Sequence, residues 1–221
     1  MRQMLKPSVK ARFIERMSIT EDQEDALYKA FLSNPDQRLI APAENGAPSV
    51  EFRFGGGWRE CRIWEGYLDA SLILLRQILE QRGLANNLIF PALFNLRHAV
   101  EVALKWHIQY GGGAVSKDAG HSLNALIESF RRTADDLDDE ASYISDYMLN
   151  RISELAIIDP RSITFRYSTE LDGSPIEIAP ERWDLHRLIF TVDGLSFWLD
   201  NLSSKIDLSR DERYQAYLRD G

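Results

Sequence analysis

Apolar residues recur every three or four positions through most of the chain, and the stretches between them are rich in glycine, proline and polar residues. This spacing is typical of α-helices that bury one face. It predicts helices over residues 20–33, 59–82, 86–110, 121–134, 140–158 and 180–203. Pro35, Gly83 and the three glycines at 111–113 fall between these segments, where they would end a helix.

Two other regions alternate apolar and polar residues, a pattern typical of β-strands. One is the segment 49–54. In the second, the segments 162–167 and 175–178 flank Asp172 and Gly173. An Asp-Gly pair between two such runs indicates a hairpin, so we expect a small β-hairpin insert near 162–178.

Long helices with short connections favour an up-and-down bundle around one core. The predicted fold is therefore a mainly α, up-and-down helical bundle with a small β-hairpin insert. Residues 1–58 would form an N-terminal helix and loop extension, and residues 59–206 the bundle with its insert. Residues 207–221 are expected to be a polar C-terminal tail, either mobile or used to bind a partner.

The composition changes this picture only by exclusion. No apolar run reaches the roughly 18 uncharged residues of a membrane span, and no apolar stretch of a signal peptide follows the basic N-terminus. Cys61 is the only cysteine, which excludes an internal disulfide and a thiolate zinc site. We expect a cytoplasmic protein with no membrane association. The net charge of −8 argues against a general polyanion-binding surface but leaves room for a local basic site.

The segment 93–105 carries the most informative cluster of polar residues. Its apolar positions form a core-facing stripe, made of Leu93, Leu96, Val100, Ala103 and Leu104. Arg97, Glu101 and Lys105 lie four residues apart on another line of the helix, and His98 borders that line. Spacing alone favours an ion-pair ladder on a solvated helix face. A functional patch would need a second segment, and His121, at the start of the next predicted helix, could supply it.

The sequences RHAVEVALK (97–105), GHSLNAL (120–126) and DPRSITFRY (159–167) occur in an order and spacing that resemble the HEPN family over roughly residues 64–202. This resemblance implies a helical bundle, often a homodimer. Many such proteins are metal-independent ribonucleases in defence, toxin–antitoxin or RNA-processing systems, whereas others only bind. The ribonuclease members carry an arginine and a histidine separated by four to six residues near the final helix. Here Arg182 and His186 are separated by three residues, which departs from that pattern and makes them a secondary candidate site on one helix face.

An RNA-directed role, either binding or metal-free cleavage, is the leading hypothesis, with RNA or a nucleotide as ligand and no cofactor. In cleavage, His98 and His121 would transfer protons, and Arg97 would stabilise the charged phosphorane. Glu101 would orient His98 or an arginine. The phosphate would be bound by Lys105 and Arg166, and Asp159 and Tyr167 would support the site from the insert.

Two alternatives remain open. His98 and Glu101 have the spacing of a carboxylate metal site, with Glu65, Asp69 and Asp146 as further ligands, although Arg97 and Lys105 would oppose a dication. The other is a non-catalytic interaction module, such as an antitoxin or sensor component that binds a protein or nucleotide. An enzyme needs the polar patch open to solvent or at a dimer cleft, whereas a scaffold would bury Arg97, Glu101 and Lys105 as mutual ion pairs.

Overall fold

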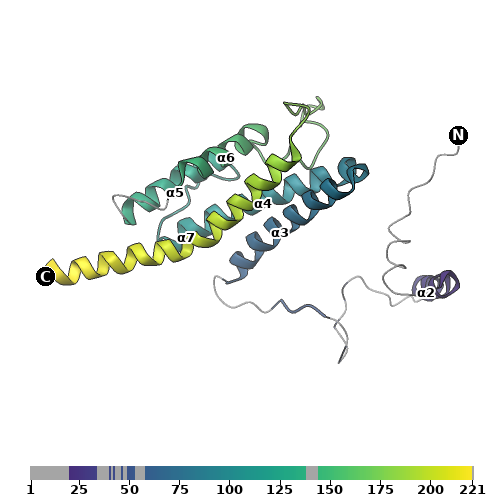
Figure 1. The fold of residues 1–221 in the computed structure, drawn as a ribbon, viewed down its shortest axis with the longest axis horizontal. Helices are drawn as coiled ribbons and strands as arrows, with labels where there is room; N and C mark the ends of the chain where they lie inside the picture. Colours follow the sequence, from purple (N-terminus) through teal and green to yellow (C-terminus); the bar gives the residue numbers. More distant parts are fainter. Residues whose placement is uncertain are drawn as a thin grey trace. The chain divides into compact units, whose positions relative to one another are not determined.

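The computed structural model describes residues 20–33, 40, 42, 46, 49–52, 58–137 and 144–220. These residues are mainly α-helical, and none of them forms a β-strand. The helices are α2 (Glu21–Ser33), α3 (Trp58–Glu80), α4 (Ala85–Tyr110), α5 (Leu123–Leu137), α6 (Asp146–Ile158) and α7 (Leu185–Asp220), with the 3₁₀ turn η1 (Arg82–Leu84) between α3 and α4 (Figure 1). The chain divides after Arg53 into two units, which we describe separately.

The first unit contains α2, and a reciprocal pair of hydrogen bonds sets its start. The Gln23 amide donates to Thr20 Oγ1 at 3.3 Å, and the Thr20 amide donates to Gln23 Oε1 at 2.9 Å. This is a capping box, which satisfies two amides that the first helical turn leaves open. The helix predicted over 20–33 is thus confirmed. Residues 49–52 are not in a strand, and the rest of the strand predicted over 49–54 lies outside the described residues.

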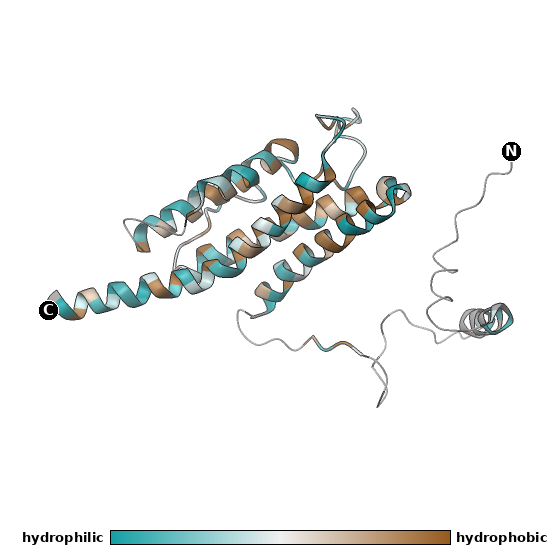
Figure 2. Ribbon diagram, viewed as in Figure 1, coloured by the Kyte–Doolittle hydropathy of each residue, from teal (hydrophilic) through white to brown (hydrophobic). Residues whose placement is uncertain are grey.

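In the second unit, the helices α3 to α7 pack around one apolar core. α3 lies along α4, and α7 contacts each of α3, α4, α5 and α6. The stripe predicted on α4 is confirmed, because all five of its residues are buried. Apolar and polar residues share the circumference of these helices, whereas the C-terminal part of α7 is mostly hydrophilic (Figure 2). Among the helices that the structure describes, none is both long and apolar enough to cross a membrane.

The glycines at 111–113 end α4 and also permit a close approach to α5. Gly112 adopts a φ of 85°, a left-handed conformation that favours glycine. A Cβ atom on Gly113 would collide with the side chain of Thr133 on α5. The chain therefore passes directly against α5 before it turns back toward α4.

The predicted β-hairpin insert is not seen. Thr169 and Pro175 form an isolated antiparallel bridge, and the turn at Gly173 is present with a φ of 85°. The residues before it coil instead of extending, because the Arg166 and Tyr167 amides both donate to the Ile163 carbonyl at 3.0 Å. The alternating pattern was misleading here, since burial does not follow it: Ser162, Thr164 and Phe165 are buried, whereas Tyr167 is exposed.

Several helix boundaries also differ from the prediction. α3 ends at Glu80 and not at 82, and α5 spans Leu123–Leu137 and not 121–134. α6 begins at Asp146, after the cap residue Ser145, whereas its start was predicted near residue 140. Residues 144 and 145 are therefore not helical as predicted, and residues 138–143 lie outside the described residues. α7 begins at Leu185 and not at 180, since the Asp184 carboxylate accepts the Arg187 amide at 3.1 Å.

α7 continues through the residues predicted as a polar tail. Ile206 and Ser209 are buried, which ties this part of the helix to the bundle. Tyr110 Oη donates to the Asp207 carboxylate at 2.8 Å, and the Arg210 guanidinium donates to the Tyr110 carbonyl. Polar residues therefore attach the end of α4 to α7. A hydrophobicity pattern does not reveal such polar contacts between helices.

His107 on α4 is the most deeply buried histidine. It has no exposed surface, its Nδ1 lies 2.7 Å from the Ala103 carbonyl, and its ring contacts those of Trp64 and Trp106. Burial lowers the pKa of His107 to about 4, because the charged imidazolium would lose its hydration. In the unfolded chain the pKa returns to about 6.5. Between these values the unfolded state binds the proton and the folded state does not.

The free energy of unfolding should therefore fall as the pH drops below about 6.5. Replacing His107 with glutamine should reduce the loss between about pH 7 and about pH 5 by about 2 kcal/mol. Urea unfolding of both proteins at several pH values would measure this. If the free energy of unfolding changes equally with pH in the wild type and the His107→Gln variant over this range, the assignment is contradicted. Just above neutral pH, the free energy of unfolding of both proteins should not change with pH.

Candidate functional site

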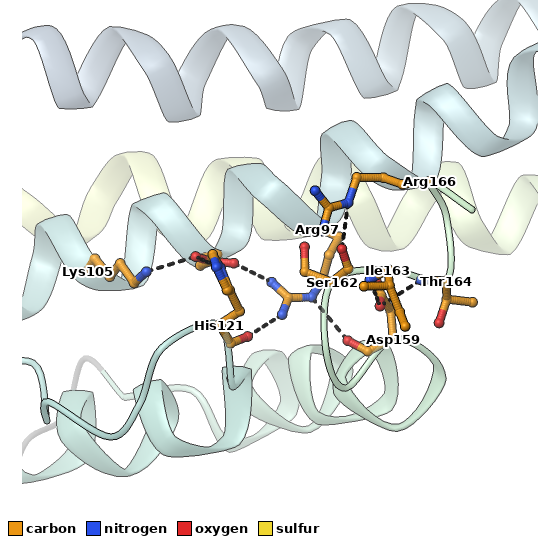
Figure 3. Close-up of polar contacts among 9 residues, drawn as sticks. Arg97, Lys105, His121, Asp159, Ser162, Ile163, Thr164 and Arg166 are labelled. Atoms are coloured by element: carbon orange, nitrogen blue, oxygen red, sulfur yellow. Dashed lines mark hydrogen bonds and ion pairs between the residues drawn. The ribbon is translucent and has the colours of Figure 1, made fainter. Parts of the chain in front are cut away.

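Arg97 occupies the centre of the polar cluster, with none of its surface exposed. Each guanidinium nitrogen has an acceptor (Figure 3). Nη1 donates to Glu101 Oε2 at 3.0 Å, Nε donates to the Asp159 carbonyl at 3.3 Å, and Nη2 donates to the His121 carbonyl. Desolvation lowers the pKa of Arg97 and Glu101 opposes this, but a guanidinium stays charged in proteins. Arg97 thus joins α4 to the loop before α5 and to the loop after α6.

The carboxylate of Glu101 is shared between the core and the surface. Oε2 accepts from Arg97, whereas Oε1 lies 2.8 Å from both Lys105 Nζ and His121 Nδ1. Burial raises the pKa of Glu101, but the hydrogen bonds from Lys105 and His121 outweigh it, and the net pKa falls below its usual value. The side chain of Glu101 is 4% exposed, that of Lys105 33% and that of His121 68%. A buried anion therefore holds two cationic or cation-forming groups at the surface.

His121 is fixed at two points, because Arg97 binds its carbonyl and Glu101 contacts its ring. An ionised carboxylate can only accept, so Nδ1 of His121 carries the hydrogen. Nε2 has no hydrogen-bond partner among the residues that the structure describes, and the ring is largely exposed. This arrangement leaves Nε2 able to accept a proton or a hydrogen bond from a ligand.

His98 lies apart from this network, with no hydrogen bond to it in the described part of the chain. Its ring is stacked on Phe94, at 5.8 Å and an interplanar angle of 7°, and meets the edge of Tyr67 at 4.7 Å. Burial lowers its pKa, although Glu101 acts in the opposite direction. The expected orientation of His98 by Glu101 is replaced by packing between aromatic rings.

The loop after α6 carries Arg166 and Tyr167, which are both exposed. Asp159 Oδ1 accepts the amides of Ile163 and Thr164, at 2.7 and 3.1 Å, and so fixes this loop. Arg166 Nε donates to the Ser162 carbonyl at 2.6 Å. The guanidinium of Arg166 lies 5.9 Å from the Phe94 ring centre and 5.4 Å from that of Tyr167, within range of a cation–π contact. Arg166 thus continues the aromatic group that contains His98.

Ser162 and Phe94 contact residues of the candidate site but were not identified from the sequence. Ser162 has a φ of 60°, which is uncommon for a residue other than glycine, and its carbonyl positions Arg166. The sequence carries no signal for this conformation. Phe94 precedes His98 by four residues, so its place on the same face of α4 was available from spacing.

The secondary candidates Arg182 and His186 do not form one site. Arg182 precedes α7, whereas His186 lies in its first turn, so the expectation that they share a helix face is wrong. Both side chains are exposed, and no contact joins them within the described residues.

Two of the three further acidic residues that a metal site would need, Glu65 and Asp146, pair with arginines instead. Glu65 pairs with Arg62 at 2.8 Å, and Asp146 pairs with Arg131 at 2.6 Å. In the described ranges, no group of three or more histidine, cysteine, aspartate or glutamate side chains is arranged to hold a metal ion. The partners proposed for His98 and Glu101 therefore do not surround them.

Comparison with protein-family models, curated proteins and solved structures finds no match for this chain.

Arg97 and Lys105 belong to one ion-pair ladder but should differ sharply in their contribution to stability. Replacing Arg97 with methionine leaves the Glu101 carboxylate buried with one hydrogen-bond partner fewer. It also removes the hydrogen bonds that Arg97 donates to the backbone carbonyls of His121 and Asp159. We expect the free energy of unfolding to fall by about 3–5 kcal/mol. The matched change Lys105→Met removes a partly exposed pair and should cost less than about 1 kcal/mol.

Urea unfolding followed by circular dichroism would compare the two variants with the wild type. Similar losses for both substitutions would show that Arg97 does not hold the loops together.

Proposed function

We propose that this chain is a HEPN-like helical module that binds RNA through the surface formed by His121, Lys105, Arg166 and Tyr167. One observation carries the proposal: Arg97 is enclosed and each of its three guanidinium nitrogens donates a hydrogen bond, whereas the groups around it reach the surface. Arg97 then acts as a structural residue that positions the binding groups. A non-catalytic module was expected to bury Arg97, Glu101 and Lys105 as mutual ion pairs; Arg97 and Glu101 are buried, whereas the side chain of Lys105 is 33% exposed.

The surface offers two kinds of contact that suit single-stranded RNA. Lys105 and Arg166 can bind phosphate, and His121 can donate or accept a hydrogen bond. Tyr167 is 59% exposed and offers a face on which a base can stack. Two or three nucleotides would engage these groups, which is compatible with a net charge of −8 because no extended basic groove is required.

The resemblance of the segments 97–105, 120–126 and 159–167 to the HEPN family supports RNA as the ligand. It also makes a homodimer and a defence or toxin–antitoxin setting the proposed context. Within the chain, Arg97 links these three segments, since its contacts run to Glu101, His121 and Asp159. The motifs that carry the resemblance therefore meet at one place.

Binding can be tested with short fluorescent single-stranded oligoribonucleotides in EDTA, by anisotropy. The Lys105→Gln, Arg166→Gln double variant should lose at least about tenfold in affinity, and the logarithm of the wild-type affinity should fall with the logarithm of salt concentration with a slope of about −1.4, as two phosphate contacts to a single strand predict. The control is Arg59→Gln, Arg62→Gln, an equal change in charge at two exposed arginines of α3. Equal affinity for all three proteins, or no binding by the wild type, would refute the proposal.

A second candidate, metal-independent RNA cleavage, is favoured by the contact between Glu101 Oε1 and His121 Nδ1. A carboxylate that orients a histidine leaves its second nitrogen free for proton transfer. His121 Nε2 would take the proton of the 2′-hydroxyl as that oxygen attacks the adjacent phosphorus, and the bond to the 5′-oxygen breaks as that oxygen takes a proton from water. Lys105 and Arg166 would stabilise the phosphorane. His98, whose pKa is lowered by burial, would be neutral at neutral pH.

Cleavage is tested by incubating the protein with labelled total RNA and tRNA in EDTA. Activity should produce 2′,3′-cyclic phosphate ends and fall by about 10²- to 10⁴-fold in the His121→Ala variant. Intact activity in a His98→Ala, His121→Ala double variant would exclude both histidines. RNA binding without cleavage by the wild type would leave the binding module as the function.

A further inference from the structure

A cavity of about 430 Å³ opens between α6, α7 and the segment 180–184. This volume is within the range of small-molecule sites. Aliphatic side chains from three helices line it, namely Leu96 of α4, Leu155 and Ile158 of α6, and Leu188, Val192 and Leu195 of α7. None of the groups assigned to RNA contributes to this lining. The cavity is therefore a separate feature of the bundle.

Three arginines and two carboxylates lie among the same lining residues. Arg151 pairs with Glu154 at 2.9 Å, yet its Nε is buried without a hydrogen-bond partner among the described residues. The side chains of Arg182 and Arg187 have neither an ion pair nor a hydrogen bond within that part of the chain. Asp184 is held at the start of α7 by the Arg187 amide. The rim thus has an excess of positive charge in a chain that is acidic as a whole.

One wall of the cavity is formed before any ligand arrives. Trp183 Nε1 donates to the Pro180 carbonyl at 2.8 Å, which holds the indole in place. The only uncharged side chain in the lining that carries a hydroxyl or amide is Thr191, and its Oγ1 already donates to the Arg187 carbonyl at 2.8 Å. The polar edge of a nucleobase would find few uncharged partners here. An aliphatic body fits this lining better.

We propose that this cavity binds a small amphipathic anion, with an aliphatic chain against the leucine, isoleucine and valine side chains and a carboxylate or phosphate head at Arg182 and Arg187. A guanidinium suits either head, since its parallel N–H groups match two oxygens of a carboxylate or phosphate. Arg151, whose Nε is buried without a hydrogen-bond partner among the described residues, lines the same cavity. Each added methylene raises the affinity about fourfold until the cavity is filled.

Isothermal titration calorimetry of the full chain with octanoate, octyl phosphate, octanol and acetate, each below its micelle concentration, tests this. Octanoate or octyl phosphate should bind at one site, and octanol at least tenfold more weakly; acetate, which lacks the chain, should not bind detectably. The tighter of the two anions identifies whether an acyl carboxylate or an alkyl phosphate is preferred. Equal affinity for octanol and the anions, or no binding of any probe, would overturn the inference.

The Arg182→Gln, Arg187→Gln double variant changes two exposed side chains and should bind the preferred anion at least tenfold more weakly. Its control is again Arg59→Gln, Arg62→Gln, which should bind it as the wild type does. RNA affinity should be unchanged in the Arg182→Gln, Arg187→Gln variant. The proposals for the anion site and for the RNA surface are therefore tested independently. Unchanged anion affinity in that variant, or loss of RNA affinity instead, would contradict a separate anion site.

Discussion

The buried guanidinium of Arg97 is the constraint on which the second unit depends. A charge removed from water must be paired and hydrogen-bonded, and its planar group has donors in three directions. Glu101, one turn further along α4, can satisfy one of these directions. The other two need acceptors from outside the helix, and the carbonyls of His121 and Asp159 supply them. Burying one side chain of α4 therefore requires two loops, distant in sequence, to close over it.

The same arrangement determines what reaches the surface. Because Glu101 gives one oxygen to Arg97 and the other to Lys105 and His121, its charge is neutralised on both sides. The cavity beside α7 does not depend on a buried ion pair. Its apolar lining is continuous with the core, and its charges lie at the opening. The bundle thus presents one polar surface built on a buried ion pair and one apolar recess with a positively charged rim.

Much of the fold could be predicted from the sequence, but the depth of the cluster could not. Spacing places Arg97, Glu101 and Lys105 along one line of α4 and identifies the apolar stripe, and both are seen. It cannot show that Arg97 is buried, because this depends on carbonyls from two loops that carry no side-chain signal. The hairpin failed because Asp159 takes the Ile163 and Thr164 amides that a strand would need for pairing. The end of α7 was placed too early because tyrosine, aspartate and arginine, rather than apolar residues, attach it to α4.

The two-point attachment of His121 has a consequence for conformational entropy. A surface histidine on an ordinary loop loses backbone and rotamer freedom when a ligand immobilises it, and this loss opposes binding. In His121 the carbonyl and the ring are already restrained by Arg97 and Glu101. Much of that ordering therefore takes place during folding, and the ring meets an incoming group as a rigid element although most of its surface faces solvent.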